Sequence, residues 1–282
     1  MDGTSIHLAA EAPVAGGELL FRPPAGRRGL ACWLALPNEV APGKAPLVAV
    51  HGIHRGAEAQ ARAFAARAFA EGRPVIAPLF DQAAWPAYQQ VVRKGRADLA
   101  LLALLDDLRA IGVCGGRRIA LAGYSGGGQF AHRFAMLYPH MIERLTVTSA
   151  GWFTFPDAAP FPYGHGPAPK ARGDWGTRMA AGLGRFLELP VAVCVGALDD
   201  QSDPTLRHRP DLDLQQGTNR VARARAWAET LRSAAGARGI AARVTFSLLP
   251  GCGHDFGDCV TRGGLDRIVL PQGAAGPDPD SR

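Results

Sequence analysis

A serine at position 125 stands in a Gly-x-Ser-x-Gly frame, between a segment typical of a β-strand and a segment typical of a helix. Residues 118–122 form an apolar run, and residues 126–137 carry Phe130 and Phe134 at helical spacing. A serine at such a sharp turn takes strained backbone angles and needs very small neighbours two positions away on each side. The turn presents the hydroxyl to solvent beside the N–H groups of a helix N-terminus, where developing negative charge is stabilised.

The frame by itself is a weak signal because glycine is abundant, with 35 glycines among the 282 residues. A glycine-rich turn with an incidental serine is the alternative interpretation. The frame indicates a nucleophile only if a base and an orienting acid are predicted to reach the serine.

Strand-type and helix-type segments alternate along the chain. The strand-type segments are residues 17–21, 30–36, 46–50, 74–79, 118–122, 145–148, 190–195 and 242–248, and the helix-type segments are residues 58–71, 94–111, 126–137 and 216–235. This alternation predicts an α/β fold with a doubly wound, mostly parallel sheet, which begins with an antiparallel pair. We expect a single domain over residues 1–270, with a lid-like insertion rich in aromatic residues and proline at about residues 152–186. We expect the tail at residues 271–282 to be disordered.

A serine hydroxyl is a poor nucleophile at neutral pH and needs a base within hydrogen-bond reach, which in turn needs an orienting carboxylate. Asp199 and His254 each follow the carboxyl end of a predicted strand, as Ser125 does, and open α/β sheets bind their ligands at that edge. His254 stands apart from the other histidines because a Pro-Gly-Cys-Gly loop delivers it after the last strand. Asp200 and Asp203 lie in the same loop as Asp199 and stay alternatives for the acid.

These motifs resemble those of the α/β-hydrolase superfamily, in particular its esterases and the serine hydrolases similar to polyhydroxyalkanoate depolymerases or dienelactone hydrolases. The resemblance covers about residues 30–260 and follows the order serine, acid, histidine. The matching segments are His51-Gly52, the turn around Ser125, Gly196-x-x-Asp199 and Gly253-His254. The resemblance implies the α/β-hydrolase fold. It also implies cleavage of carboxylic esters, short-chain or polyester-type, through an acyl-enzyme on Ser125.

The resemblance further assigns the oxyanion hole to the backbone N–H groups of Ile53 and Gly126. Substrate contacts are expected near the nucleophile and at the start of the insertion, from His51, Tyr124, Trp152, Phe153 and Phe155. The aromatic residues of the insertion form either a wall above the nucleophile or a small core under the loop. Arg55 is expected to be a surface charge, with contact to a substrate carboxylate as the alternative.

The net charge is +6, but the arginines are scattered and no Lys/Arg block of the nucleic-acid-binding type is present in the sequence. No apolar run approaches the ~20 residues that span a membrane, and residues 1–17 do not have the pattern of a signal peptide. Five widely spaced cysteines argue against a disulfide framework and against a zinc site, with a Cys252–Cys259 bridge left open. We therefore expect a cytoplasmic monomer or homodimer that uses no metal and no cofactor and acts on a small-molecule or polymeric ester.

Two other functions are compatible with the same motifs. A serine peptidase of the prolyl-oligopeptidase-like type has a similar glycine-rich turn, although those enzymes usually carry a large extra domain that this chain is too short to hold. A non-catalytic binding protein of the same fold is the other alternative. Proteins of that kind typically lose a member of the triad, and here all three residue types are present.

Overall fold

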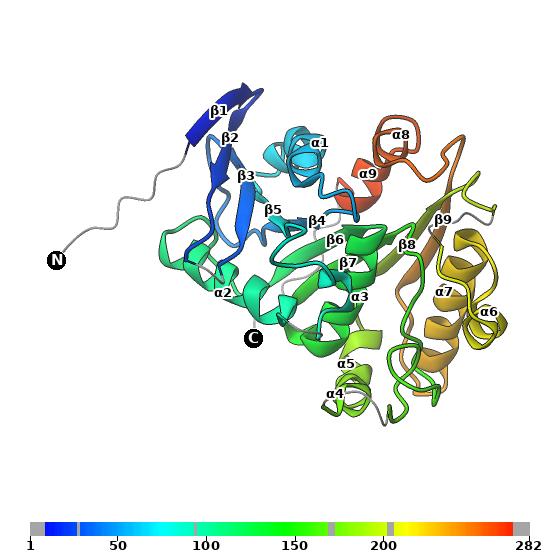
Figure 1. Cartoon of the computed structure of the whole chain (residues 1–282). Coiled ribbons are helices and arrows are strands. Elements are labelled where there is room, and N and C mark those ends of the chain that lie inside the picture. The colour runs from blue at the N-terminus through cyan, green and yellow to red at the C-terminus, as the bar shows by residue number, and fades with distance from the viewer. Residues whose placement is uncertain (1–8, 27–28, 93–94, 169–172, 202–205, 273–282) are drawn as a thin grey trace.

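A nine-stranded sheet forms the centre of the protein, which we describe from a computed structural model (Figure 1). The structure describes residues 9–26, 29–92, 95–168, 173–201 and 206–272. The strands are β1 (Ala9–Val14), β2 (Gly17–Arg22), β3 (Ala31–Pro37), β4 (Leu47–Val50), β5 (Val75–Leu79), β6 (Ile119–Tyr124), β7 (Ile142–Thr148), β8 (Val191–Gly196) and β9 (Val244–Leu249).

The strand order is β1-β2-β3-β5-β4-β6-β7-β8-β9. The pairs from β1 to β5 are antiparallel, and the six strands from β5 to β9 along the sheet are parallel. After β4 the chain moves outward to β5 and then returns to form β6 on the other side of β4. The loops that follow β4 and β6 therefore leave the sheet side by side at a topological switch point, where sheets of this kind bind their ligands.

Helices cover both faces of the sheet (Figure 1). The helices are α1 (Ala57–Phe69), α2 (Ala97–Ala110), α3 (Gly126–Leu137), α4 (Trp175–Ala181), α5 (Leu183–Leu187), α6 (Pro210–Gln216), α7 (Arg220–Gly236), α8 (Phe256–Thr261) and α9 (Leu265–Val269), with short 3₁₀ turns at Tyr88–Gln90 and Pro139–Met141. The helices α1, α8 and α9 lie on one face, and α2, α3 and α7 lie on the other.

The two faces differ because successive strand residues point to opposite sides of a sheet. In β6, Ile119 and Leu121 pack with α2, α3 and α7, whereas Ala120 and Ala122 face the alanine-rich helix α1. Large side chains fill the α3 face, and small ones allow α1 to approach the sheet closely. The two clusters of buried apolar side chains provide the main stabilisation of the sheet.

The sequence predicted the alternation of strands and helices correctly, and the prediction of a doubly wound, mostly parallel sheet is confirmed. It missed β1, α6, α8 and α9, which are short and have weak periodicity. The predicted helix at residues 216–235 is α7, which begins at Arg220 because Gly217 has a φ of 100° and Asn219 caps the helix by accepting a hydrogen bond from the Ala222 N–H. The predicted disordered tail lies almost wholly outside the described residues.

The segment at residues 152–186 contains two short helices, α4 and α5, that the sequence did not predict. Its first aromatic side chains pack inward. Phe153 is 0% exposed and stacks on Trp227 of α7 with ring centroids 4.7 Å apart, and Phe155 is 3% exposed. Of the two arrangements expected for these residues, the structure has the core under the loop.

No helix among the described residues is both long and apolar enough to cross a membrane.

The turn between β6 and α3 brings backbone segments into close contact, which explains its glycines. A Cβ atom at Gly127 would lie 1.9 Å from the Val50 carbonyl oxygen, and one at Gly123 would lie 2.2 Å from the Gly127 carbonyl oxygen. Real Cβ contacts are never so short, so only glycine allows β4, β6 and the start of α3 to meet here.

Replacing Gly127 with alanine is expected to lower the free energy of unfolding by at least about 3 kcal/mol, because backbone on both sides of the new methyl group cannot move away. Gly236 at the end of α7 is the matched control, since nothing lies within 4 Å of its Cβ position. Gly236→Ala is expected to stabilise the protein by about 0.5–1 kcal/mol through helix propensity. Urea unfolding of both variants measures the difference, and equal stabilities would contradict the packing argument.

Candidate active site

Ser125 lies at the tip of the turn between β6 and α3, with φ 53° and ψ −115°. Positive φ is strained for a residue with a Cβ atom. Two hydrogen bonds hold the conformation: the Ser125 N–H donates to the Thr148 carbonyl over 2.8 Å, and the Gln129 N–H donates to the Ser125 carbonyl over 3.1 Å. The strained turn directs the side chain away from the sheet, toward the carboxyl ends of the strands.

The structure brings Ser125, His254 and Asp199 together in one chain of hydrogen bonds. The Ser125 Oγ lies 3.1 Å from His254 Nε2, and His254 Nδ1 lies 2.8 Å from Asp199 Oδ2. Because an ionised carboxylate only accepts, neutral His254 carries its proton on Nδ1 and leaves Nε2 free to accept from the hydroxyl. This is the tautomer that a general base for Ser125 requires.

Asp199, rather than Asp200, meets the imidazole of His254. The Asp199 side chain is 4% exposed and also accepts a hydrogen bond from Arg220 Nη1 over 3.0 Å at Oδ1. Arg220, itself 4% exposed at the start of α7, therefore fixes the carboxylate so that Oδ2 faces His254. Asp200 is exposed and accepts from its neighbour Gln201. The third alternative, Asp203, lies outside the described residues.

The loops that carry the acid and the histidine are bonded to each other. The Ala197 N–H donates to the Leu249 carbonyl and the Leu198 N–H to the Cys252 carbonyl, each over 2.9 Å. A Cβ atom at Gly196 would lie 2.4 Å from the Cys252 carbonyl oxygen, so the glycine of the Gly-x-x-Asp motif allows this approach. Beyond His254, Asp255 caps α8 by accepting from the Asp258 N–H. The base is thus held from both sides.

Tyr124 packs against the imidazole instead of facing the site. Its ring is stacked on His254 with centroids 5.3 Å apart and an angle of 28° between the planes, and the residue is 9% exposed. Tyr124 thus supports the His254 ring, and its contact with substrate stays a prediction.

Ile53 and Gly126 lie close together beside Ser125, as the oxyanion hole requires. A Cβ atom at Gly126 would be 3.5 Å from Ile53 N. In the part of the chain that the structure describes, neither amide donates to a backbone carbonyl. Both donors are therefore available to an oxygen atom placed between them.

His51 holds the loop that carries the Ile53 amide. Its Nε2 accepts a hydrogen bond from the Phe80 N–H over 3.0 Å, so its proton is on Nδ1, which donates to the Gly52 carbonyl over 2.8 Å. That carbonyl belongs to the same peptide group as the Ile53 N–H, so the imidazole orients the donor. The Tyr88 hydroxyl donates to the His51 carbonyl over 2.6 Å. Because His51 is 0% exposed, it positions the loop and does not contact substrate, contrary to the prediction.

Burial lowers the pKa of His51 from its ordinary value of 6.5 to about 4. The imidazole is therefore neutral near neutral pH and keeps the tautomer that orients the Gly52–Ile53 peptide.

The remaining predicted contact residues, Trp152, Phe153 and Phe155, belong to the wall of the core. Trp152 is 5% exposed, and the buried guanidinium of Arg133 lies 3.9 Å from the centre of its ring. Arg133 donates to Thr154 Oγ1 and to the carbonyls of Gln89 and Gln129, which joins three segments around Ser125. For Phe153 and Phe155 the prediction of substrate contact is wrong, because their rings are enclosed by other apolar side chains.

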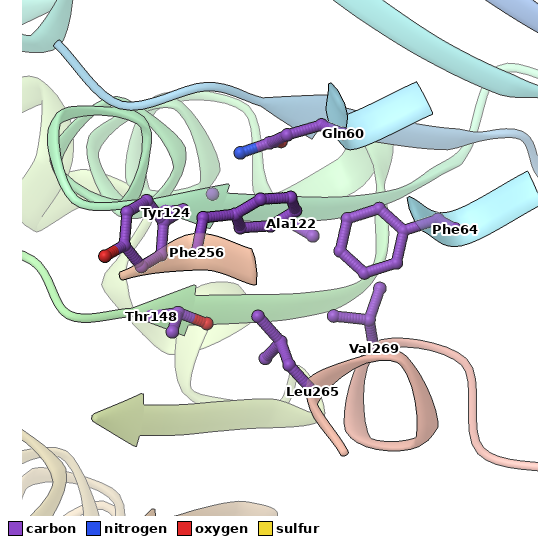
Figure 2. A pocket seen from close by; sticks show the side chains of 9 residues that line it. Gln60, Phe64, Ala122, Tyr124, Thr148, Phe256, Leu265 and Val269 are labelled. Carbon is purple, nitrogen blue, oxygen red and sulfur yellow. The ribbon is translucent and has the colours of Figure 1, made fainter. Parts of the chain in front are cut away.

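A small cavity lies behind the turn, on the α1 face of the sheet (Figure 2). Its volume is about 10 Å³, and Phe64, Ala122, Phe256 and Leu265 are among the side chains that line it. This volume holds at most one water molecule. The cavity is a gap in the packing beside Tyr124, and Ser125 is not among its lining residues.

Within the described ranges no three His, Cys, Asp or Glu side chains come together as a metal site would require. All five cysteines are free and buried, so the structure contains no Cys252–Cys259 bridge.

No protein-family model matches the sequence, and no curated protein matches it. Solved structures do match. Poly(aspartic acid) hydrolase-1 from Sphingomonas sp. KT-1 aligns with a TM-score of 0.72 and 24% identity over 90% of this chain and 97% of its own. A poly(3-hydroxybutyrate) depolymerase from Bordetella parapertussis aligns with a TM-score of 0.72 and 24% identity over 94% and 92% of the two chains. An S-formylglutathione hydrolase from Agrobacterium tumefaciens aligns with a TM-score of 0.62 and 13% identity over 93% and 99%.

These likenesses establish the fold. The chain has the α/β-hydrolase fold, and the resemblance that the sequence motifs indicated is confirmed at that level.

Sequence reasoning missed three residues that hold the site, namely Arg220, Tyr88 and Arg133. Each acts through a contact between segments distant in the chain, such as Arg220 with Asp199 and Tyr88 with His51. Arg133 has one sequence signal, since an arginine among apolar residues of a buried helix must find partners. The other two have none.

The low pKa of His51 predicts a pH dependence of stability. The unfolded chain takes up this proton near pH 6.5 and the folded chain only near pH 4, so this group's stabilising contribution is complete above about pH 6.5. The free energy of unfolding is expected to fall by up to about 3 kcal/mol as the pH drops through this window. Urea unfolding between about pH 7 and about pH 4.5 should show a shallower decline for His51→Gln than for the wild type. Parallel declines would contradict the assignment.

Proposed function

We propose that the protein is a serine hydrolase that cleaves carboxylic esters through an acyl-enzyme on Ser125. The observation that carries the proposal is the continuous pair of hydrogen bonds from Ser125 through His254 to Asp199, next to two available backbone amides. The names of the structural neighbours, which include esterases and depolymerases, support hydrolysis as the reaction class.

In the first half of the proposed reaction, the Ser125 Oγ attacks the ester carbonyl carbon and His254 Nε2 takes the hydroxyl proton. The carbonyl oxygen becomes an oxyanion and accepts hydrogen bonds from the Ile53 and Gly126 N–H groups. Asp199 stabilises the imidazolium through its bond to Nδ1. The face of the Tyr124 ring, which is stacked on His254, also stabilises the positive charge of the imidazolium.

The tetrahedral intermediate then collapses. The bond to the leaving oxygen breaks, and His254 gives its proton to that oxygen, so the alcohol departs and the acyl group stays on Ser125. A water molecule repeats the sequence on the acyl-enzyme, with His254 as base, and releases the acid. The charges and protons balance over the cycle.

Short-chain or polyester-type substrates fit the surface around the site best. Ile53, in the loop that carries one of the two proposed oxyanion donors, is 46% exposed. Leu198, which directly precedes Asp199, is 63% exposed. Apolar side chains at this rim favour contact with an acyl chain or with successive units of a polyester. A poly(3-hydroxybutyrate) depolymerase among the neighbours is consistent with this substrate class.

Ser125→Ala is expected to lower kcat/KM for 4-nitrophenyl butyrate by at least ~10⁴-fold while far-ultraviolet circular dichroism stays unchanged, because no other group supplies the nucleophile. Undiminished turnover by this variant would refute the proposal. A comparison of peptide 4-nitroanilides with 4-nitrophenyl esters distinguishes an esterase from the peptidase alternative, and labelling of Ser125 by a fluorophosphonate distinguishes an enzyme from a binding protein.

Asp199→Asn is expected to lower kcat by about 10³–10⁴-fold, because the amide no longer selects the Nδ1–H tautomer of His254. Asp200→Asn is the matched control, since Asp200 is exposed and accepts a hydrogen bond from Gln201. It is expected to keep kcat within about twofold of the wild type. The reverse order of effects would assign the acid to Asp200.

A further inference from the structure

Arg55 is a cation built into the oxyanion loop, two residues beyond Ile53. Its backbone has φ 64°, a strained value for arginine. The Arg55 N–H donates to the Gly52 carbonyl over 3.1 Å, and the Ala57 N–H donates to the Arg55 carbonyl over 2.8 Å, which hold that conformation. These bonds fix the backbone from which the Arg55 side chain projects.

The guanidinium lies over the ring of Tyr88, a residue that also reaches the start of α3. Arg55 Cζ is 4.5 Å from the centre of the Tyr88 ring, and the pair makes a cation–π contact. The hydroxyl of that same ring would lie 2.9 Å from a Cβ atom at Gly126. Tyr88 therefore lies between the guanidinium and Gly126, with its ring under the guanidinium and its hydroxyl next to Gly126.

Arg55 forms no salt bridge with the residues that the structure describes, although the nearby Asp81 acts on it electrostatically. Its Nη2 donates a hydrogen bond to the neutral amide oxygen of Gln82 over 2.6 Å. Its Nε and Nη1 are buried without a partner. The nearby Asp81 uses its Oδ1 to accept from the Ala83 and Ala84 N–H groups. A partly desolvated cation with unused donors favours an anion that comes from outside the chain.

We propose that Arg55 anchors a carboxylate of the substrate, so that the preferred esters carry a free carboxylate. The inference rests on the proposed ester hydrolysis and names its substrate class. The exposed Gln82 amide occupies the place of one carboxylate oxygen, and the substrate displaces it. The planar guanidinium then offers donors to both oxygens, a geometry that lysine does not provide.

The carboxylate can belong to the acyl part or to the alcohol part, and two matched substrate pairs separate these sources. The first pair is 4-nitrophenyl hydrogen adipate and 4-nitrophenyl hexanoate. The second pair is 4-acetoxybenzoate and 4-acetoxybenzamide. For each pair the measured quantity is the ratio of kcat/KM for the charged ester to kcat/KM for the neutral ester. A high ratio in the first pair places the anion in the acyl group, and a high ratio in the second places it in the alcohol.

Arg55→Gln is expected to lower the ratio at least ~10-fold in one of the two pairs, because the charge-assisted hydrogen bonds are lost. Gln82→Glu is expected to lower the same ratio although Arg55 is intact, because the new carboxylate forms a salt bridge with the guanidinium and competes with the substrate. Arg62→Gln is the matched control for loss of one positive charge, since Arg62 is an exposed residue of α1 paired with Glu58. This control should leave the ratio unchanged. Ratios unchanged in Arg55→Gln, or lowered equally in Arg62→Gln, would overturn the proposal.

A binding measurement does not depend on turnover. Adipate and 4-hydroxybenzoate stand for the acyl-side and alcohol-side anions, and calorimetric titration of one of them into Ser125→Ala is expected to give a Kd at least ~10-fold lower than titration into Ser125→Ala/Arg55→Gln. Equal affinities of the two variants for both anions, or no binding of either anion, would overturn the proposal. If one anion binds as expected but no ester is hydrolysed by the wild type, the proposed function fails and the anion site stands.

Discussion

The arrangement of the site depends on the contact between three backbone segments at the switch point of the sheet. The Val50 carbonyl comes so close to Gly127 that no side chain fits between them. In the same tight turn Ser125 adopts a positive φ. This approach puts the start of α3 beside the loop after β4, so Gly126 and the Ile53 amide nitrogen lie close together. Strain at a single serine is thus balanced by the packing of the whole parallel sheet.

Around this contact the protein uses buried polar groups to fix orientation. His51 orients the Gly52–Ile53 peptide in its neutral form, and Arg220 orients Asp199 by a buried ion pair. A buried charge is costly unless it is paired, and Arg220 Nη1 and Asp199 Oδ1 form such a pair. The groups that would react are therefore placed by neighbours that do not touch the reacting atoms, which is how a preorganised site keeps its geometry.

Arg55 differs from these paired groups. Its guanidinium is held by an aromatic ring and by a neutral amide, without a described carboxylate in reach. The contrast with Arg220 shows two uses of arginine in one site. Arg220 forms a buried ion pair that orients Asp199, whereas Arg55 contacts an aromatic ring and a neutral amide, which is why we propose it as the anchor for a substrate carboxylate.

The sequence by itself determined the alternation of strands and helices, the turn at Ser125 and the order in which Asp199 and His254 follow it, because these are local patterns with a fixed period or spacing. It left Asp199, Asp200 and Asp203 as alternatives, and it assigned Phe153 to the substrate. Only the tertiary structure decided these points. The packing of distant segments decides which aspartate meets His254 and whether the Phe153 ring faces the site or Trp227. The residues next to them in the sequence do not determine those contacts.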